Sequence, residues 1–426
     1  MNNEAKLQIV KKEEQTMSGI DIALLWIGAG ISMAAVFAGE ALAGLGMKWG
    51  LLVIILGNLI GGIPMYFLSV IGTKEGIPGM VSTRPSFGIR GSFFASLVNV
   101  FQLIGWIAVM LLLAAEACVS AAESLHIGDN IYFWVIMLGV IITIFAVIGH
   151  KHWKWFQWII IGTTVLLSIV MTYAVLTQYS FAELWVKEPS GGISFGLGLD
   201  SVIAMCLSWV PLVPDYTRYA RSVKGAANGT YWGNFVASVW MFFVGLLCAI
   251  ATGLLNESPV PILSSLGLGL GGLLIILFST IATTFLAVFS SGVSANNILP
   301  KAGEKPLIVI AGILGTLLAL IFPMTEYQSF LIIIGAVFIP LEGVVMTDYF
   351  LVRKKFIPTE LFKKGGSYWY SKGFNIKGFV AFGIGFAVYL TAYFQEWMIG
   401  SSCISFVATM IAYYSIAKIF VPQKRS

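Results

Sequence analysis

Charged residues are scarce in this sequence. Lysine, arginine, aspartate and glutamate make up 11% of its 426 residues, whereas hydrophobic residues make up 58%. Average soluble domains carry about 25% charged residues. A soluble protein of this length could not keep so much apolar surface away from water. The composition therefore excludes a soluble protein and predicts one whose solvent is lipid.

Histidine and cysteine are also rare. The 3 histidines lie in polar connections, which excludes a proton relay through membrane-buried histidine: His126, His150 and His152. The 4 cysteines are scattered through apolar stretches without metal-ligand spacing and are interpreted as small buried hydrophobic residues: Cys118, Cys206, Cys248 and Cys403. A membrane-embedded enzyme would need a cluster of such groups, so the sequence disfavours an enzyme, and no metal cofactor is expected.

Long apolar runs fill most of the chain. A helix needs about 20 apolar residues to span a bilayer. Twelve stretches satisfy this requirement: 22–46, 49–72, 93–119, 131–149, 155–177, 197–213, 229–253, 267–292, 307–323, 329–346, 378–395 and 399–420. We therefore predict an all-α polytopic membrane protein with twelve transmembrane helices. The connections leave no room for a sensor's output domain, and no repeated polar ring favours a channel.

The distribution of lysine and arginine predicts the orientation. Residues Met1 to Met17 are polar and lack the features of a signal peptide, which indicates a cytosolic tail. With the N-terminus inside, Lys48 and Lys187 face outward, and all the other basic residues lie on the inner side. Both termini are therefore expected in the cytoplasm, and the net charge of +5 reflects topology, not a nucleic-acid partner. The expected location is the bacterial inner membrane.

Two stretches depart from a uniform apolar rod. The stretch 22–46 contains Gly28 and Gly30, and the sixth stretch contains Pro211 and Pro214. We expect both to unwind or kink, because proline removes a backbone donor and clashes with the preceding turn. If the first ten helices form two inverted five-helix repeats, these helices occupy matching positions, which is the best pointer to a transporter's binding site. Small-residue helix packing is the alternative interpretation.

Three threonines share one face of the eighth stretch. Thr280, Thr283 and Thr284 are spaced i, i+3 and i+4. Their hydroxyls, with carbonyls freed where the first helix unwinds, could supply hard oxygen ligands to sodium. Alternatively, the hydroxyls bond back to carbonyls of their own helix.

Two tryptophans lie far from either predicted membrane interface. Flat faces such as those of Trp106 and Trp209 suit a flat heterocycle, although ordinary packing would also explain them. Buried carboxylates are costly in a bilayer, so three of them are rival coupling sites for a proton: Glu40, Glu116 and Glu342.

A series of short motifs runs through nearly the whole chain. In order they are Leu25–Gly28, Leu56–Gly62, Gly76–Pro78, Arg84–Gly91, Gly105–Trp106, Pro214–Arg221 and Thr347–Tyr349. Together they resemble the nucleobase–cation symporter family of cytosine, purine, uracil, allantoin and thiamine-precursor permeases. The resemblance implies a leucine-transporter-like fold of two five-helix inverted repeats and two further helices. The implied segments are tails at 1–18 and 421–426, repeats at 19–177 and 196–346, a cytoplasmic connection at 347–377 and the last helices at 378–420.

The resemblance also implies site residues. Trp106 matches a tryptophan that stacks on the substrate, and Ser208 matches a serine that touches the base. The remaining residues of the predicted substrate site are Gly30, Met110, Trp209 and Phe285. The predicted sodium site comprises Thr280, Thr283 and Thr284 with the backbone carbonyls of Gly28 and Ile31.

One departure bears on the substrate. Members that bind cytosine or hydantoins use an asparagine on the eighth helix, whereas Phe285 to Phe289 of this chain contain no amide. The third and eighth stretches are most similar to the branch of hydroxymethylpyrimidine permeases. The expected function is therefore import of a pyrimidine-like base or thiamine precursor with a cation, Na⁺ being favoured. A proton-coupled permease for a purine, allantoin or another heterocycle is the alternative.

Overall fold

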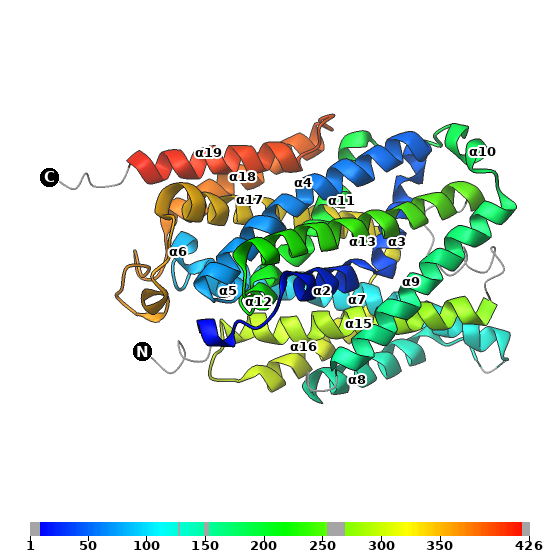
Figure 1. The fold of residues 1–426 in the computed structure, drawn as a ribbon, viewed down its shortest axis with the longest axis horizontal. Coiled ribbons are helices and arrows are strands. Elements are labelled where there is room, and N and C mark those ends of the chain that lie inside the picture. Colours follow the sequence, from blue (N-terminus) through cyan, green and yellow to red (C-terminus); the bar gives the residue numbers. More distant parts are fainter. Residues whose placement is uncertain (1–8, 127, 149–152, 254–268, 420–426) are drawn as a thin grey trace.

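The computed structural model describes residues 9–126, 128–148, 153–253 and 269–419, and helices account for nearly all of its regular structure (Figure 1). The long helices are α4 (Gly46–Glu75), α7 (Ser92–Ser124), α8 (Ile131–Ile148), α9 (Trp153–Gln178), α11 (Phe195–Trp209), α13 (Val223–Thr252), α15 (Gly269–Asn296), α16 (Glu304–Ala319), α17 (Tyr327–Thr347), α18 (Ile376–Phe394) and α19 (Ser402–Ile419). The shorter ones are α2 (Gly19–Gly30), α3 (Met33–Glu40), α5 (Gly79–Ser82), α6 (Arg84–Phe87), α10 (Phe181–Val186) and α12 (Val213–Thr217).

Among the described residues, each of the twelve predicted stretches overlaps one helix or a run of consecutive helical segments, and residues 149 and 420, at the ends of two stretches, are not described. Within the described residues, 8 helical segments are long and apolar enough to cross a membrane by length and composition alone. The helix α16 has 16 residues and is shorter than the 18 residues that this criterion requires. The start of the eighth stretch, at 267–268, lies outside the described residues. The predicted connection after α17 begins as further helix, because a π-helical segment covers Asp348–Arg353.

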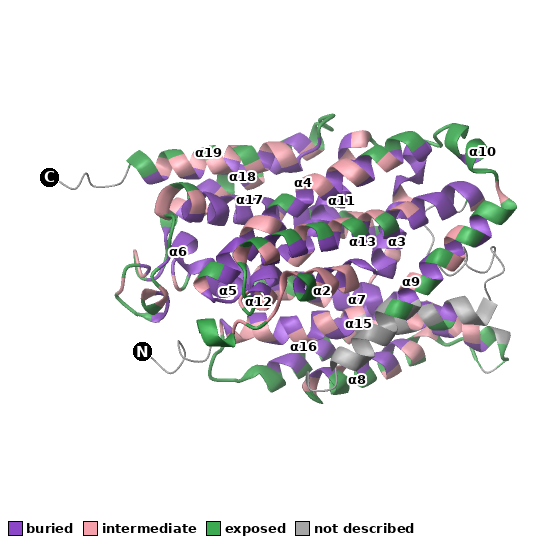
Figure 2. Ribbon diagram, in the orientation of Figure 1, coloured by how far each residue is buried: buried purple, intermediate pink, exposed green. Residues whose placement is uncertain are grey.

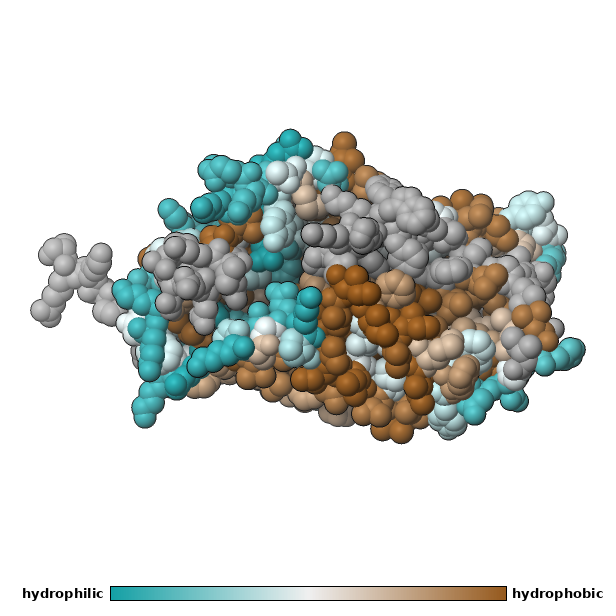
Figure 3. All heavy atoms as spheres, turned by 90° about the horizontal axis from the view of Figure 1, so that it is seen from below, coloured by the Kyte–Doolittle hydropathy of each residue, from teal (hydrophilic) through white to brown (hydrophobic). Residues whose placement is uncertain are grey.

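The helices form a bundle whose buried side chains lie along its middle (Figure 2). The helix α13 packs against α2, α3 and α4, while α15 packs against α7 and α16. The helices α18 and α19 lie along one edge, beside α17, and α8 and α16 lie along the opposite edge (Figure 1). Figure 3 shows hydrophobic residues gathered across the middle of one face and hydrophilic ones nearer its ends, as expected where lipid surrounds the helices.

The backbones of α3 and α13 approach each other unusually closely. A Cβ at Gly39 would overlap the backbone of Phe242, and a Cβ at Gly245 would overlap the backbone of Val36. Each helix therefore supplies one glycine where the other passes. Such small-residue contacts provide van der Waals packing between helices in lipid, where no hydrophobic effect holds them together.

The predicted interruption of the first helix is present, slightly beyond the glycines. The helix α2 ends at Gly30, Ile31 has ψ 85°, and Ser32 is extended with φ −136° and ψ 139°. The Ser32 hydroxyl then accepts a hydrogen bond from the backbone N–H of Ala34 at 3.2 Å and so caps α3. The carbonyls in the last turn of α2 have no partner within that helix.

Of the two outcomes expected at the prolines, unwinding does not occur. The chain passes from α11 through a 3₁₀ turn, Val210–Leu212, into α12 with helical backbone angles throughout. Both prolines occupy the first turn of their segments. There the missing N–H would have no helical acceptor in any case. The helix therefore tightens where the sequence predicted that it could open.

The last helix is held near both of its ends. At its start, the carboxylate oxygens of buried Asp200 on α11 accept hydrogen bonds from the backbone N–H groups of Ser401 at 2.7 Å and Ser402 at 2.8 Å. Near its other end, the Tyr413 hydroxyl donates to Asp348 at 2.7 Å. The helix α19 thus joins α11 to the end of α17.

We predict that Asp200→Ala destabilises the protein, because two buried backbone N–H groups lose a charged acceptor. The expected cost is about 1.5–3 kcal/mol, measured as a lower thermal midpoint of the protein purified in detergent. Asp200→Asn keeps one acceptor oxygen and should lose less stability. The control is Glu188→Ala, at an exposed position. Equal midpoints for Asp200→Ala and the control would contradict this role.

Candidate functional site

A cavity lies beside the interruption of the first helix. It is bounded by the ends of α2 and α11, the start of α3 and the middle of α7, α13 and α15. The lining residues are Ala29, Gly30, Ser32, Ala34, Ala35, Leu103, Trp106, Met110, Met205, Cys206, Ser208, Trp209, Asn234, Ser238, Thr283 and Ala287. Its free volume is about 30 Å³, more than the roughly 10–15 Å³ that a cavity needs to hold a water molecule. We call it the central cavity.

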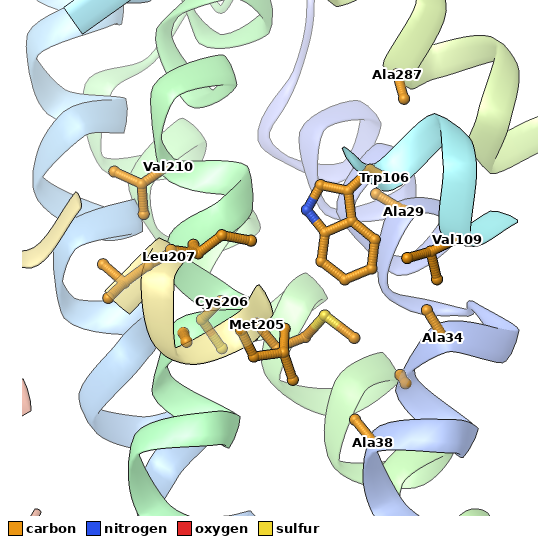
Figure 4. Close-up of a cluster of buried hydrophobic side chains, with 14 of the residues drawn as sticks. Ala29, Ala34, Ala38, Trp106, Val109, Met205, Cys206, Leu207, Val210 and Ala287 are labelled. Atoms are coloured by element: carbon orange, nitrogen blue, oxygen red, sulfur yellow. The ribbon is translucent and has the colours of Figure 1, made fainter. Parts of the chain in front are cut away.

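Five of the six residues predicted to bind substrate line the central cavity: Gly30, Trp106, Met110, Ser208 and Trp209. Figure 4 shows the Trp106 ring between Ala29 and Ala34 on one side and Met205 on the other. The sixth residue, Phe285, does not line the cavity. It is buried, and its ring is parallel to that of Phe289, with centroids 6.4 Å apart.

Two other aromatic residues pack against the ring of Trp106. Phe330 and Tyr327 meet it edge-on, with centroids 5.3 Å and 6.1 Å away. The Tyr327 hydroxyl donates to the carbonyl of Ala34 at 3.1 Å and so ties α17 to the start of α3. The indole N–H of Trp106 is buried and has no hydrogen-bond partner in the described part of the chain. A ligand in the central cavity could supply the missing acceptor.

Ser208 is held within a network of side-chain amides. Its hydroxyl donates to the carbonyl of Met205 at 2.7 Å. Its own carbonyl accepts from the Gln102 amide at 2.9 Å, and the same amide donates to Asn99 at 2.7 Å. The carboxamide oxygen of Gln102 is buried without a partner among the described residues.

Sequence reasoning missed two polar residues of the central cavity. Asn234 and Ser238 lie four residues apart on α13 and are buried. The Asn234 amide donates to the sulfur of Cys206 at 3.7 Å, and the Cys206 thiol donates to Asn58 at 3.3 Å. Their spacing within an apolar stretch was the available signal, because polar residues four apart share a helix face.

The structure places the predicted sodium residues at and next to the central cavity. Thr283 lines it together with Gly30. Thr280 and Thr284 are fully buried, and their hydroxyls donate to the carbonyls of Ile276 at 2.7 Å and of Thr280 at 2.6 Å. These bonds to carbonyls of the same helix are the ones expected from the alternative interpretation of the threonines. A hydroxyl that donates its hydrogen nevertheless keeps lone pairs with which to bind a cation.

The two predicted backbone ligands flank the end of α2. Gly28 lies in the last turn of that helix, and Ile31 is the first residue after it. The N–H of Ile31 donates to Ile27 at 3.0 Å. Neither residue lines the central cavity, although Ala29 and Gly30 between them do.

The predicted coupling carboxylates lie away from the cavity wall. Glu40 is fully buried at the end of α3, Glu116 is half-buried on α7, and Glu342 is buried on α17. Glu116 is ten residues beyond Trp106, about 15 Å along the helix axis. The described residues contain no group of three or more histidine, cysteine or carboxylate side chains that could hold a metal ion.

Two solved structures of a similar protein share the overall fold of this chain. An inward-facing structure of Mhp1 is 18% identical, with a TM-score of 0.85 over 98% of this chain and 94% of that one. A closed structure of Mhp1, a nucleobase–cation–symport family transporter with bromovinylhydantoin bound, gives 0.84 at 19% identity, over 98% and 95% of the two chains. These similarities confirm the predicted fold.

Curated relatives are permeases. The putative purine–cytosine permease YxlA of Bacillus subtilis is 26% identical over 85% of this chain and 82% of its own length. The cytosine permease of Escherichia coli K12 is 26% identical over 79% of each chain. A family model described as permease for cytosine/purines, uracil, thiamine and allantoin matches residues 9–416. The chain therefore belongs to this family of multi-pass membrane permeases and is a transporter, not an enzyme.

Proposed function

We propose that this protein imports a pyrimidine-like heterocycle, hydroxymethylpyrimidine or cytosine, together with Na⁺ by alternating access. One observation carries the proposal: the central cavity lies at the interruption of the first helix and is lined by both Trp106 and Thr283. Interrupted backbone at membrane depth is tolerated where it lines a cavity, and transporters bind substrates and ions there.

The lining of the central cavity suits a flat ring with a polar edge. Trp106 offers an aromatic face and an indole N–H without a partner. Stacking of a base on an aromatic ring contributes about 1–3 kcal/mol. Ser208 and Asn234 supply a hydroxyl and an amide on neighbouring walls. Asn234 offers, from α13, the amide side chain that residues 285–289 of α15 lack.

The small volume of the central cavity supports an alternating-access cycle. A space of about 30 Å³ exceeds the roughly 10–15 Å³ that a water molecule needs, but it leaves little room for a six-membered ring. The ring can enter only when helices or side chains move. We assign the structure to a contracted stage of the cycle, and the interrupted segment at Ile31 and Ser32 is the natural point of movement.

The proposed ion site combines hydroxyl and backbone oxygens. The hydroxyls of Thr280 and Thr284 face away from water and already donate their hydrogens. The last turn of α2 offers carbonyls without helical partners. Together these are neutral oxygen ligands, which the carbonyls of Gly28 and Ile31 would complete. Sodium bound there would stabilise the interrupted segment that forms part of the substrate site.

Proton coupling is the second candidate, favoured by the complete burial of Glu40. This carboxyl group lies at the end of α3, the segment that follows the interruption. Movement of α3 could therefore alter its protonation. Glu40→Gln should abolish pH-driven uptake if this candidate is correct, and leave sodium-driven uptake intact if it is not.

We expect sodium to increase substrate affinity. Purified protein should be screened by thermal shift against pyrimidines, purines, hydantoins and thiamine precursors, in sodium and in potassium buffers. The proposal predicts the largest stabilisation for hydroxymethylpyrimidine or cytosine in sodium, because a ligand that binds only the folded state stabilises it. A shift that is the same in both salts would rule out sodium symport.

Trp106→Ala should weaken binding of the ring at least about fivefold, since 1 kcal/mol of lost stacking corresponds to that factor. Trp106→Phe keeps an aromatic face and should lose less. The matched control is Trp232→Ala, because Trp232 lies on α13 and is 53% exposed at the outer surface. Unchanged affinity in Trp106→Ala would remove this residue from the substrate site.

Thr284→Ala should abolish the sodium dependence of substrate binding while the protein stays folded, because one ion ligand is lost. Binding is measured over a sodium titration, and folding by the thermal midpoint. Thr391→Ala serves as the control, because the Thr391 hydroxyl makes the same type of bond to the carbonyl four residues earlier and lies on an exposed face. An unaltered sodium dependence in Thr284→Ala would exclude the proposed ion site.

A further inference from the structure

A second cavity lies near the C-terminal end of α15, one of the helices that line the central cavity. Its volume is about 250 Å³, much larger than that of the central cavity. The end of α12, the end of α15, α5 and the start of α16 form its walls. On the proposed orientation, this is the cytoplasmic side. We call it the release-side cavity.

The helix α15 connects the two cavities along one face. Thr283 and Ala287 line the central cavity, whereas Val293 and Ser294 line the release-side cavity. Positions 283, 287, 290 and 294 are spaced three or four residues apart, so they share that face. From 287 to 293 the helix rises about 9 Å. A ring leaving the central cavity along α15 would therefore reach the second cavity within about two turns.

Aromatic side chains fill the space between the two cavities. Trp26 is fully buried and meets Trp209 and Tyr216 edge-on, with centroids 6.1 Å and 6.2 Å away. Trp209 lines the central cavity, and Tyr216 directly follows Asp215, which lines the release-side cavity. These aromatic contacts therefore lie between the two cavities.

The release-side cavity is lined by polar groups of several kinds. Asp215, Arg218 and Glu304 contribute charged side chains, and Asp215 accepts a hydrogen bond from the N–H of Gly79 at 2.9 Å. The carboxamide oxygen of Asn296 is buried and has no hydrogen-bond partner in the described ranges. A small ring with N–H donors and acceptors on its edge would satisfy such a lining.

The neighbouring residue, Asn297, already uses its side chain in hydrogen bonds within the described part of the protein, whereas the side-chain oxygen of Asn296 does not. Asn297 donates to the hydroxyls of Ser96 at 2.8 Å and Ser92 at 3.3 Å, and its oxygen accepts from Arg84 at 2.7 Å. Its amide is therefore committed to holding α15 against α7. Among the described residues, the side-chain oxygen of Asn296 accepts no hydrogen bond, and Asn296 lines the release-side cavity.

We infer that the release-side cavity is a second binding site for the transported heterocycle, which the ring occupies after passing Tyr216, with Asn296 accepting a hydrogen bond from a ring or exocyclic N–H. The inference rests on the proposed function for the chemistry of the ring. Its volume suits a single ring, whereas its charged walls suit a polar edge better than an apolar ligand.

The test uses two cysteines in one purified protein, one reporting on each cavity. Native Cys206 lines the central cavity, and Val293→Cys would line the release-side cavity. N-ethylmaleimide labelling of each is followed by mass spectrometry, with hydroxymethylpyrimidine or cytosine as the probe. At a probe concentration of about twice its Kd, the labelling rate at position 293 should fall about threefold, because a third of the sites remain free.

Variants separate the two sites. Trp106→Ala should remove protection of Cys206 and leave protection at position 293. Asn296→Ala should remove protection at position 293 alone, and Asn296→Asp, which keeps an acceptor oxygen, should retain it. If Val293→Cys does not fold, Pro300→Cys on the same cavity replaces it.

Two results would overturn the second site: protection of Cys206 with none at position 293, or protection at position 293 that disappears with Trp106→Ala. The latter would mean that the central site alone binds and acts at a distance. Failure of the proposed function is a different result, because Cys206 would then stay unprotected whatever happens at position 293.

Discussion

The backbone's need for hydrogen bonds in lipid constrains the whole structure. An N–H or C=O group without a partner costs several kcal/mol in a bilayer, yet the chain leaves helical geometry at Ile31 and Ser32. The interruption persists because Ser32 caps the helix that follows and because α13 packs closely against both α2 and α3. Ala29 and Gly30, at the end of α2, are buried and line the central cavity. The candidate site for polar ligands therefore lies where the helix is interrupted, at Ile31 and Ser32.

Much of the fold could be predicted from the sequence, because a bilayer requires long apolar runs and these are visible without any structure. The glycine-rich stretch likewise pointed to an interruption close to where Ile31 and Ser32 place it. The prolines were less informative. Pro211 and Pro214 both stand in a first turn, where proline fits a helix well. Whether a proline opens a helix depends on where the segment begins, which the sequence does not reveal.

The site was predicted in part for a similar reason. Trp106, Ser208 and Trp209 were found because they lie on helices that appeared irregular or matched family motifs, and all three line the central cavity. Asn234 and Ser238 were missed because α13 is a regular helix, and which of its faces meets the cavity depends on tertiary packing. Phe285 was assigned to the substrate site from its position in the chain, but it lies on another face of α15.

The attachment of α19 has a consequence for how far the helices can travel. One end of this helix is fastened to α11 through Asp200, and the region near its other end is fastened to the segment after α17 through Tyr413 and Asp348. A straight helix hardly changes its length. The helix α19 therefore acts as a brace between α11 and the segment after α17, and it limits how far these two can move apart without itself lining the central cavity.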